Sequence, residues 1–157
     1  KPYGSSKVLP YEKFYFVGGL NSIRAWAPRR LGPGSFARRD DDGEIIYDIE
    51  QPGELILESS IEFRTKIVGF VHGAAFVDVG NVWSVSADDQ REGADFKLNR
   101  FYKEIAVGTG LGLRLDFSFL IFRFDVGVKI YDPARAGVVP FNDKHSRTYN
   151  IGLGYPF

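Results

Sequence analysis

The sequence predicts an all-β protein: an antiparallel meander of about five strands of the transmembrane type, together with one long loop. Three observations lead to this prediction. Several segments alternate between apolar and polar residues with the two-residue period of a strand. Aromatic residues make up 15% of the chain and glycine occurs 18 times, which favours sheet over helix. Long loops also alternate with tight turns, as they do in outer-membrane barrels.

Composition and charge exclude several other classes of protein. Twenty basic and 20 acidic residues give a net charge of zero, which argues against a nucleic-acid partner. Cysteine is absent, so disulfides and thiolate metal sites are excluded. No apolar run suits a membrane-spanning helix or the core of a signal peptide. Methionine is also absent, and we therefore expect a processed or excised piece of a longer chain.

Residues 17–34 have neither helical nor strand periodicity and are expected to form a shaped loop. Four glycines and two prolines in this segment supply unusual or fixed φ angles. One arginine, Arg24, stands between Ile23 and Trp26 in this frame. Taken alone, the segment is equally consistent with a solvated surface loop and with a functional one.

Strand alternation begins at residue 55 and divides the chain into a lead-in with a large loop, residues 1–54, and a strand region, residues 55–157. Strands are expected at about 55–67, 70–83, 102–116, 119–131 and 147–157. Each has one apolar face, and the opposite face mixes charges with small residues. Five glycines lie on that second face: Gly108, Gly110, Gly112, Gly152 and Gly154. A face of this kind suits a backbone lying against it, since glycine permits close approach.

Strands that are apolar outward and polar inward, with long and short connections in alternation, indicate an outer-membrane barrel. The long connections would be extracellular and the C-terminus periplasmic. Five strands are too few to close a barrel, because about eight is the lower limit. A soluble β-domain that binds a ligand or a partner remains an alternative at this point.

Three motifs, in this order, resemble the BamA/TamA superfamily of outer-membrane assembly and two-partner secretion barrels. The loop motif is Gly18-Gly19-Leu20-Asn21-Ser22-Ile23-Arg24-Ala25-Trp26 with Leu31-Gly32-Pro33, similar to that family's Val-Arg-Gly-aromatic loop. The strand motif is Phe76-Val77-Asp78-Val79-Gly80, extended by Asn81-Val82-Trp83. The terminal assembly signal is Asn150-Ile151-Gly152-Leu153-Gly154-Tyr155-Pro156-Phe157. Ala25 departs from the family's usual glycine, and its methyl group restricts φ there.

The resemblance implies a fold and a set of partners. The chain would be the C-terminal part of a 16-stranded barrel of the bacterial surface antigen type, most similar to Bacteroidetes versions and preceded by POTRA domains. Its partners would be outer-membrane lipid, client outer-membrane or secreted proteins, and accessory lipoproteins. Its function would be protein insertion, assembly or translocation, through a weak seam between the first and last strands. An alternative is the barrel part of a patatin-like lipase fusion.

No nucleophile–base pair, phosphate-binding loop or metal-ligand spacing is found in the sequence, so we expect neither a catalytic site nor a metal or other cofactor. The candidate site is instead an ion pair. An arginine folded into a barrel lumen loses hydration and needs a paired acceptor. Strand alternation places Asp78 and Glu62 on the inward faces of adjacent strands, and the resemblance places the loop arginine against the acid of the strand motif. We therefore predict an Arg24–Asp78 contact with Glu62 as the second acid, forming a lumen latch. In the alternative, Asp78 pairs with Arg114 or Arg123.

Overall fold

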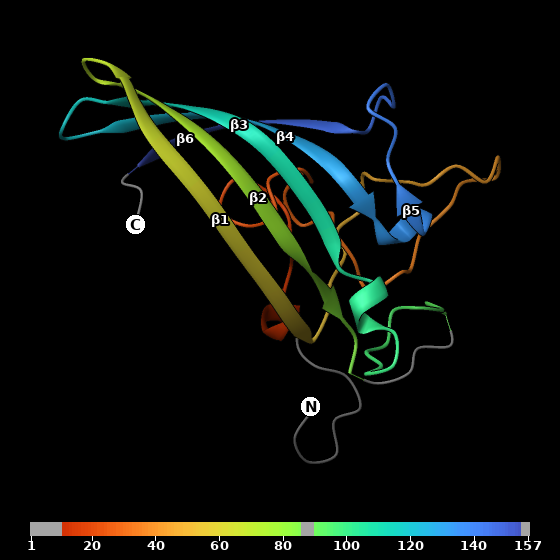
Figure 1. Cartoon of the computed structure of the whole chain (residues 1–157). Coiled ribbons are helices and arrows are strands. Elements are labelled where there is room, and N and C mark those ends of the chain that lie inside the picture. Colours follow the sequence, from red (N-terminus) through yellow and green to blue (C-terminus); the bar gives the residue numbers. More distant parts are fainter. Residues whose placement is uncertain (1–10, 86–89, 155–157) are drawn as a thin grey trace.

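The computed structural model describes residues 11–85 and 90–154, which form one curved antiparallel sheet with its long connections gathered at one end (Figure 1). The strands are β1 (Leu55–Val68), β2 (Val71–Trp83), β3 (Ala106–Asp116), β4 (Ile121–Asp132), β5 (Gly137–Val138) and β6 (Arg147–Gly154). Three short 3-10 helices are η1 (Tyr11–Lys13), η2 (Phe101–Lys103) and η3 (Pro133–Arg135). No helix in the described residues has the length and hydropathy of a transmembrane span. The predicted all-β antiparallel meander is confirmed.

The strands pair in chain order from β1 to β4, and both β5 and β6 then pair with β4. Two strands begin at least two residues later than expected. Residues 101–103 form η2 instead of beginning a strand, because the amides of Arg100 and Phe101 both donate to the Lys97 carbonyl, at 3.0 and 2.9 Å. The fourth strand begins at Ile121, not at residue 119, because the Phe117 amide donates to the Leu120 carbonyl at 3.0 Å and closes a turn there.

Two further differences concern the C-terminal third. The two-residue strand β5 lies within the segment expected to be an unstructured loop, where it pairs with the end of β4. Strand β6 is described as far as Gly154. Tyr155, Pro156 and Phe157 of the terminal assembly signal lie outside the described residues.

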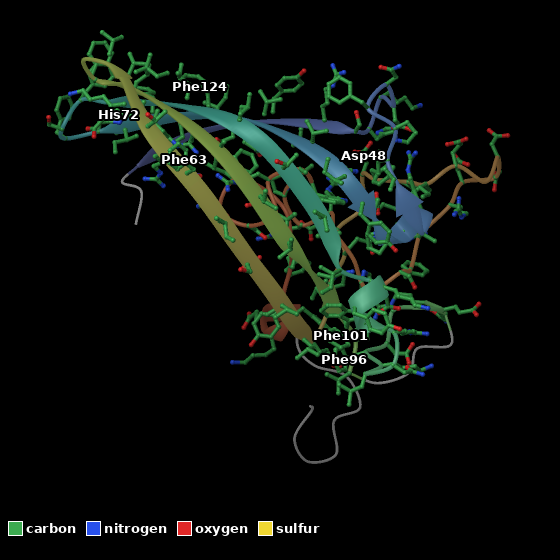
Figure 2. The ribbon with its side chains drawn as sticks, in the orientation of Figure 1. Asp48, Phe63, His72, Phe96, Phe101 and Phe124 are labelled. Carbon is green, nitrogen blue, oxygen red and sulfur yellow. The ribbon has the colours of Figure 1, made fainter. Side chains whose placement is uncertain are left out.

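The convex face of the sheet is apolar and exposed, whereas the concave face is polar and buried. On the convex face, Ile61, Phe63 and Ile151 are between 70 and 76% exposed. Phe124 projects outward from this same face in Figure 2. Asp78 and Asp125 on the concave face are 0 and 2% exposed. This is the inverse of a soluble sheet. It argues against the soluble β-domain and matches the lipid-facing and lumen-facing alternation of an outer-membrane barrel.

Tight turns occupy the other end of the sheet, at residues 69–70 and 117–120, opposite the long segments 90–105 and 133–146 (Figure 1). Figure 2 shows His72 near the tight turns and Phe96 beside Phe101 at the long-loop end. The loop at residues 17–34 lies under the concave face. The hydrophobic core lies between this loop and the sheet, and it consists of Val17, Ile23, Ala25, Trp26, Leu31, Val82 and Ala106.

Candidate functional site: the anchored loop

Arg24 and Asp78 form a buried, bidentate ion pair between the loop and strand β2. The Arg24 Nε donates to Asp78 Oδ2 at 2.9 Å, and its Nη2 donates to Asp78 Oδ1 at 2.8 Å. The backbone amide of Arg24 also donates to Asp78 Oδ2, at 2.9 Å. Arg24 is 3% exposed and Asp78 is fully buried. Such fork-to-fork geometry fixes both the distance and the orientation of the loop relative to β2.

Strand β1 supplies the remaining partners of the guanidinium. Its Nη1 donates to Glu62, and its Nη2 donates to Ser60 Oγ at 3.0 Å. The Ser60 hydroxyl in turn donates to Asp78 Oδ1 at 2.6 Å. The ring centroid of Phe76, in the strand motif, lies 3.4 Å from the Arg24 Cζ and stacks on its face. The arginine is thus held by two strands and one ring, as a buried charge requires.

The alternative partners of Asp78, Arg114 and Arg123, are engaged elsewhere. Arg114 pairs with Asp125 at 2.6 Å and with Glu62 at 3.1 Å. Arg123 lies 3.6 Å from Asp125 and donates to the loop side chain of Asn21 at 3.3 Å. Glu62 therefore links the Arg24 pair to a second group of charges on β3 and β4.

The loop motif folds into a compact turn that presents Arg24 to the sheet. The Gly18 amide donates to Ser22 Oγ at 3.0 Å, and the Gly19 amide donates to the Trp26 carbonyl at 2.9 Å. Gly18 has a φ of 111°, and a Cβ there would lie 2.4 Å from a loop carbonyl oxygen. The buried side chains of Ile23 and Trp26 pack in the core on either side of Arg24.

Ala25 fits the loop although the family resemblance predicts glycine there. It does not have a positive φ, so its methyl group meets no backbone strain. The methyl group points at Gly108, where a second Cβ would lie only 2.6 Å away. The missing side chain on β3 therefore makes room for the added one on the loop.

Only some of the inward glycines lie under the loop. Gly108 and Gly152 do, whereas Gly110 and Gly112 are covered by other atoms of the sheet itself and Gly154 has no atom within 4 Å of its Cβ position. The backbone of the loop comes closest to the sheet at Gly127 of β4, which the sequence did not single out as part of this surface. A Cβ at Gly127 would lie 2.5 Å from the Arg24 carbonyl oxygen.

A second attachment holds the Leu31–Gly34 end of the loop to the end of β2. Asn81 Nδ2 donates to the Gly34 carbonyl at 2.8 Å, and the Gly34 amide donates to the Val82 carbonyl at 2.7 Å. Beside it, Trp83 Nε1 donates to Glu104 Oε2 at 2.7 Å, and Ser35 Oγ donates to the same carboxylate at 3.3 Å. In the sequence, Asn81-Val82-Trp83 is an extension of the strand motif, and that pattern does not predict these hydrogen bonds.

We expect Trp83→Phe to lower the free energy of unfolding by about 1–3 kcal/mol, because the Glu104 carboxylate, only 3% exposed, loses a donor. Urea unfolding of the barrel in lipid vesicles measures the loss. Tyr102→Phe is the control, since Tyr102 is 59% exposed and should leave stability unchanged. A Trp83→Phe barrel as stable as the parent would contradict a structural role for this bond.

A third attachment joins residues 44–50, which follow the loop in the chain, to the end of β4 near Asp132. Tyr47 donates its hydroxyl to Asp132 Oδ2 at 3.0 Å and accepts from Arg135 Nε at 2.7 Å. Arg135 also pairs with Asp143 at 2.7 Å. The Lys129 Nζ lies 3.8 Å from the Tyr47 ring centroid and 5.1 Å from that of Trp26. Tyr47 therefore contacts three charged side chains, those of Asp132, Arg135 and Lys129.

Burial, followed by the charge of Asp132, raises the pKa of Tyr47 from its ordinary 10 to about 12, despite the opposing effect of Arg135. A pKa raised by folding stabilises the protein fully below pH 10, and this stabilisation is lost as the pH rises towards 12. We expect the phenolate absorbance of the parent minus that of Tyr47→Phe to show one group titrating near pH 12. A difference spectrum that titrates near pH 10 would contradict this hydrogen-bonded arrangement.

In the parts of the chain that the structure describes, no group of three or more histidine or carboxylate side chains is placed to hold a metal ion. The contacts above are those of a structural anchor, in which the buried charges of Arg24, Asp78 and Glu62 are paired with one another. Fold and site together define a class: a segment of an outer-membrane-type β-barrel whose large loop is fastened against the inward face.

Comparison with known families agrees with that class. The family model described as the Omp85 superfamily domain matches residues 1–157, and the chain belongs to this superfamily. Proteins of the superfamily lie in the outer membrane, where they insert, assemble or translocate other proteins.

Proposed function

We propose that this chain is the C-terminal part of a 16-stranded barrel of the BamA/TamA and bacterial surface antigen type, which inserts client outer-membrane proteins or translocates secreted ones. Residues 1–54 would be the lead-in and large extracellular loop, and residues 55–157 the last strands. The observation that carries the proposal is the loop fastened to the concave face by Arg24, Asp78 and Glu62, because a lumen latch of this kind keeps a large loop inside a barrel.

The free edge of strand β6 supplies a place where a client strand could pair. Within the described residues it pairs only with β4, so its other edge presents free backbone donors and acceptors. An edge of this kind can add a strand from another chain. We propose that β6 forms one side of a seam that opens to receive a client strand.

The topology supports one orientation. The tight turns and the end of β6 lie at the same end of the sheet, and short connections are periplasmic in outer-membrane barrels. The C-terminus would then be periplasmic, next to upstream POTRA domains and accessory lipoproteins. The exposed apolar convex face would contact outer-membrane lipid.

Reconstitution tests the proposal. The barrel that contains this chain is placed in lipid vesicles and mixed with a urea-denatured outer-membrane client, whose folding is followed by its heat-modifiable migration on a gel. We expect faster client folding than in empty vesicles, and slower folding with Arg24→Ala than with the exposed-loop control Arg39→Ala. A secreted client that becomes protected inside the vesicles would identify translocation as the activity. Neither folding nor protection above empty vesicles would refute the proposed function.

A further inference from the structure

We propose that Thr148 and Asn150 of β6 are positioning residues that tie the edge strand of the sheet to the anchored loop. Asn150 Nδ2 donates to the Arg24 carbonyl at 2.9 Å, and Thr148 Oγ1 donates to the Ala25 carbonyl at 2.8 Å. The two residues lie two positions apart on the inward face of β6 and bind two successive peptide groups of the loop.

These bonds make the backbone at Arg24 a bridge between distant strands. Its amide donates to Asp78 of β2 at 2.9 Å, while its carbonyl accepts from Asn150 of β6. Arg24 is 3% exposed, Ala25 is fully buried and Asn150 is 8% exposed. Water therefore cannot readily replace the donors from β6, and a buried carbonyl without a partner is costly.

Two glycines of the sheet, which have no side chain, let the loop backbone come close enough to form these bonds. Gly127 of β4 lies directly beneath the Arg24 carbonyl, and Gly152 of β6 lies beneath Leu20, where a Cβ would be 2.1 Å from a Leu20 methyl carbon. The segment from Leu20 to Trp26 consequently contacts all five long strands: β1 and β2 through the guanidinium, β3 at Gly108, β4 at Gly127 and β6 at Thr148 and Asn150.

A displacement of β6 therefore has a defined effect on the loop. If β6 leaves its place to pair with an incoming strand, the Arg24 and Ala25 carbonyls lose their donors, and the loop is released from one side of the sheet. Coupling of this kind is reciprocal, so loosening the Arg24–Asp78 pair should also loosen β6. The inference rests on the proposed function in one respect, that β6 is the strand that moves during client entry.

Hydrogen–deuterium exchange on the intact barrel in lipid vesicles, without a client, tests the coupling. Thr148→Val keeps the shape of the side chain and removes the hydroxyl, whereas Thr148→Ser keeps the hydroxyl. We expect about fivefold faster exchange in peptides covering residues 17–27 for Thr148→Val and Asn150→Leu, the effect of one lost buried hydrogen bond. Thr148→Ser and the lipid-facing control Ile151→Val should exchange like the parent.

Reciprocity is measured with Asp78→Asn, which should speed exchange in residues 147–154 although Asp78 lies on β2. Unchanged loop exchange in Thr148→Val, or equal acceleration in Thr148→Ser, would overturn the inference. If Asn150→Leu fails to assemble, the Thr148 pair alone decides the matter. Exchange is measured without a client, so coupling can fail while client insertion persists, and insertion can fail while coupling is present.

Discussion

Asp78→Ala should lower the free energy of unfolding of the barrel by about 3–5 kcal/mol, because it leaves the Arg24 guanidinium buried without its bidentate partner. Arg24→Ala should lower the free energy of unfolding by a similar amount, since it leaves the fully buried Asp78 carboxylate without its positive partner. The double variant should lose clearly less than the sum of the two single losses, because it removes both charges. Urea unfolding in lipid vesicles, followed by tryptophan fluorescence, measures all three.

Arg24→Lys tests the geometry of the pair separately from its charge. Lysine keeps the positive charge but cannot donate in parallel to both Asp78 oxygens or stack its plane on Phe76, so it should restore only part of the lost stability. Asp42→Asn removes a carboxylate from an exposed loop turn and should leave stability unchanged. Additive losses in the Arg24 and Asp78 double variant would show that the two residues act independently, and the latch would then be wrong.

Gly127→Val should detach the loop from β4 without altering any charged side chain. A Cβ there would lie 2.5 Å from the Arg24 carbonyl oxygen and 2.8 Å from the Ala25 Cα, and these backbone atoms cannot rotate away as a side chain would. The loop must therefore rise from the sheet, and overpacking of this kind typically costs about 1–3 kcal/mol. Protease digestion of the loop in the assembled barrel, with the unfolding free energy, measures the effect.

Gly137→Ala is the matched control for this substitution. Gly137 has a permissive φ, and its nearest neighbour would be 3.9 Å from an added Cβ. The control barrel should resist protease like the parent, whereas Gly127→Val should be cut within residues 17–34. Equal resistance of the two variants would mean that the loop does not depend on close contact with β4.

Much of the fold could be predicted from the sequence because a strand with one apolar and one polar face alternates with a period of two residues. The alternation placed Asp78 and Glu62 on the inward face, and the family resemblance directed Arg24 towards Asp78. In the structure Arg24 is bonded to both acids. Strand ends were read less well: η2 replaces the start of one expected strand because local turn bonds to Lys97 compete with the sheet ladder.

Other parts of the site depend on contacts that no local pattern contains. The sequence marked Asn150 only as part of a terminal motif, yet its side chain donates to a carbonyl 126 positions earlier. In the sequence, Gly127 is one small residue among the charges of its strand, and Trp83 is the last residue of the strand-motif extension. Their roles became visible only when the path of the loop across the sheet was known.

The sequence by itself determined the strands and their lipid-facing and lumen-facing sides, since these follow from short-range periodicity, and it placed Asp78 and Glu62 on the inward face. The pairing of Arg24 with these acids was implied by the family resemblance. The tertiary structure alone decided which glycines lie beneath the loop and which side chains of β2, β3 and β6 hold its backbone. The physical reason is that those contacts depend on the register of every intervening strand, and a shift of one residue would turn each of these side chains to the opposite face.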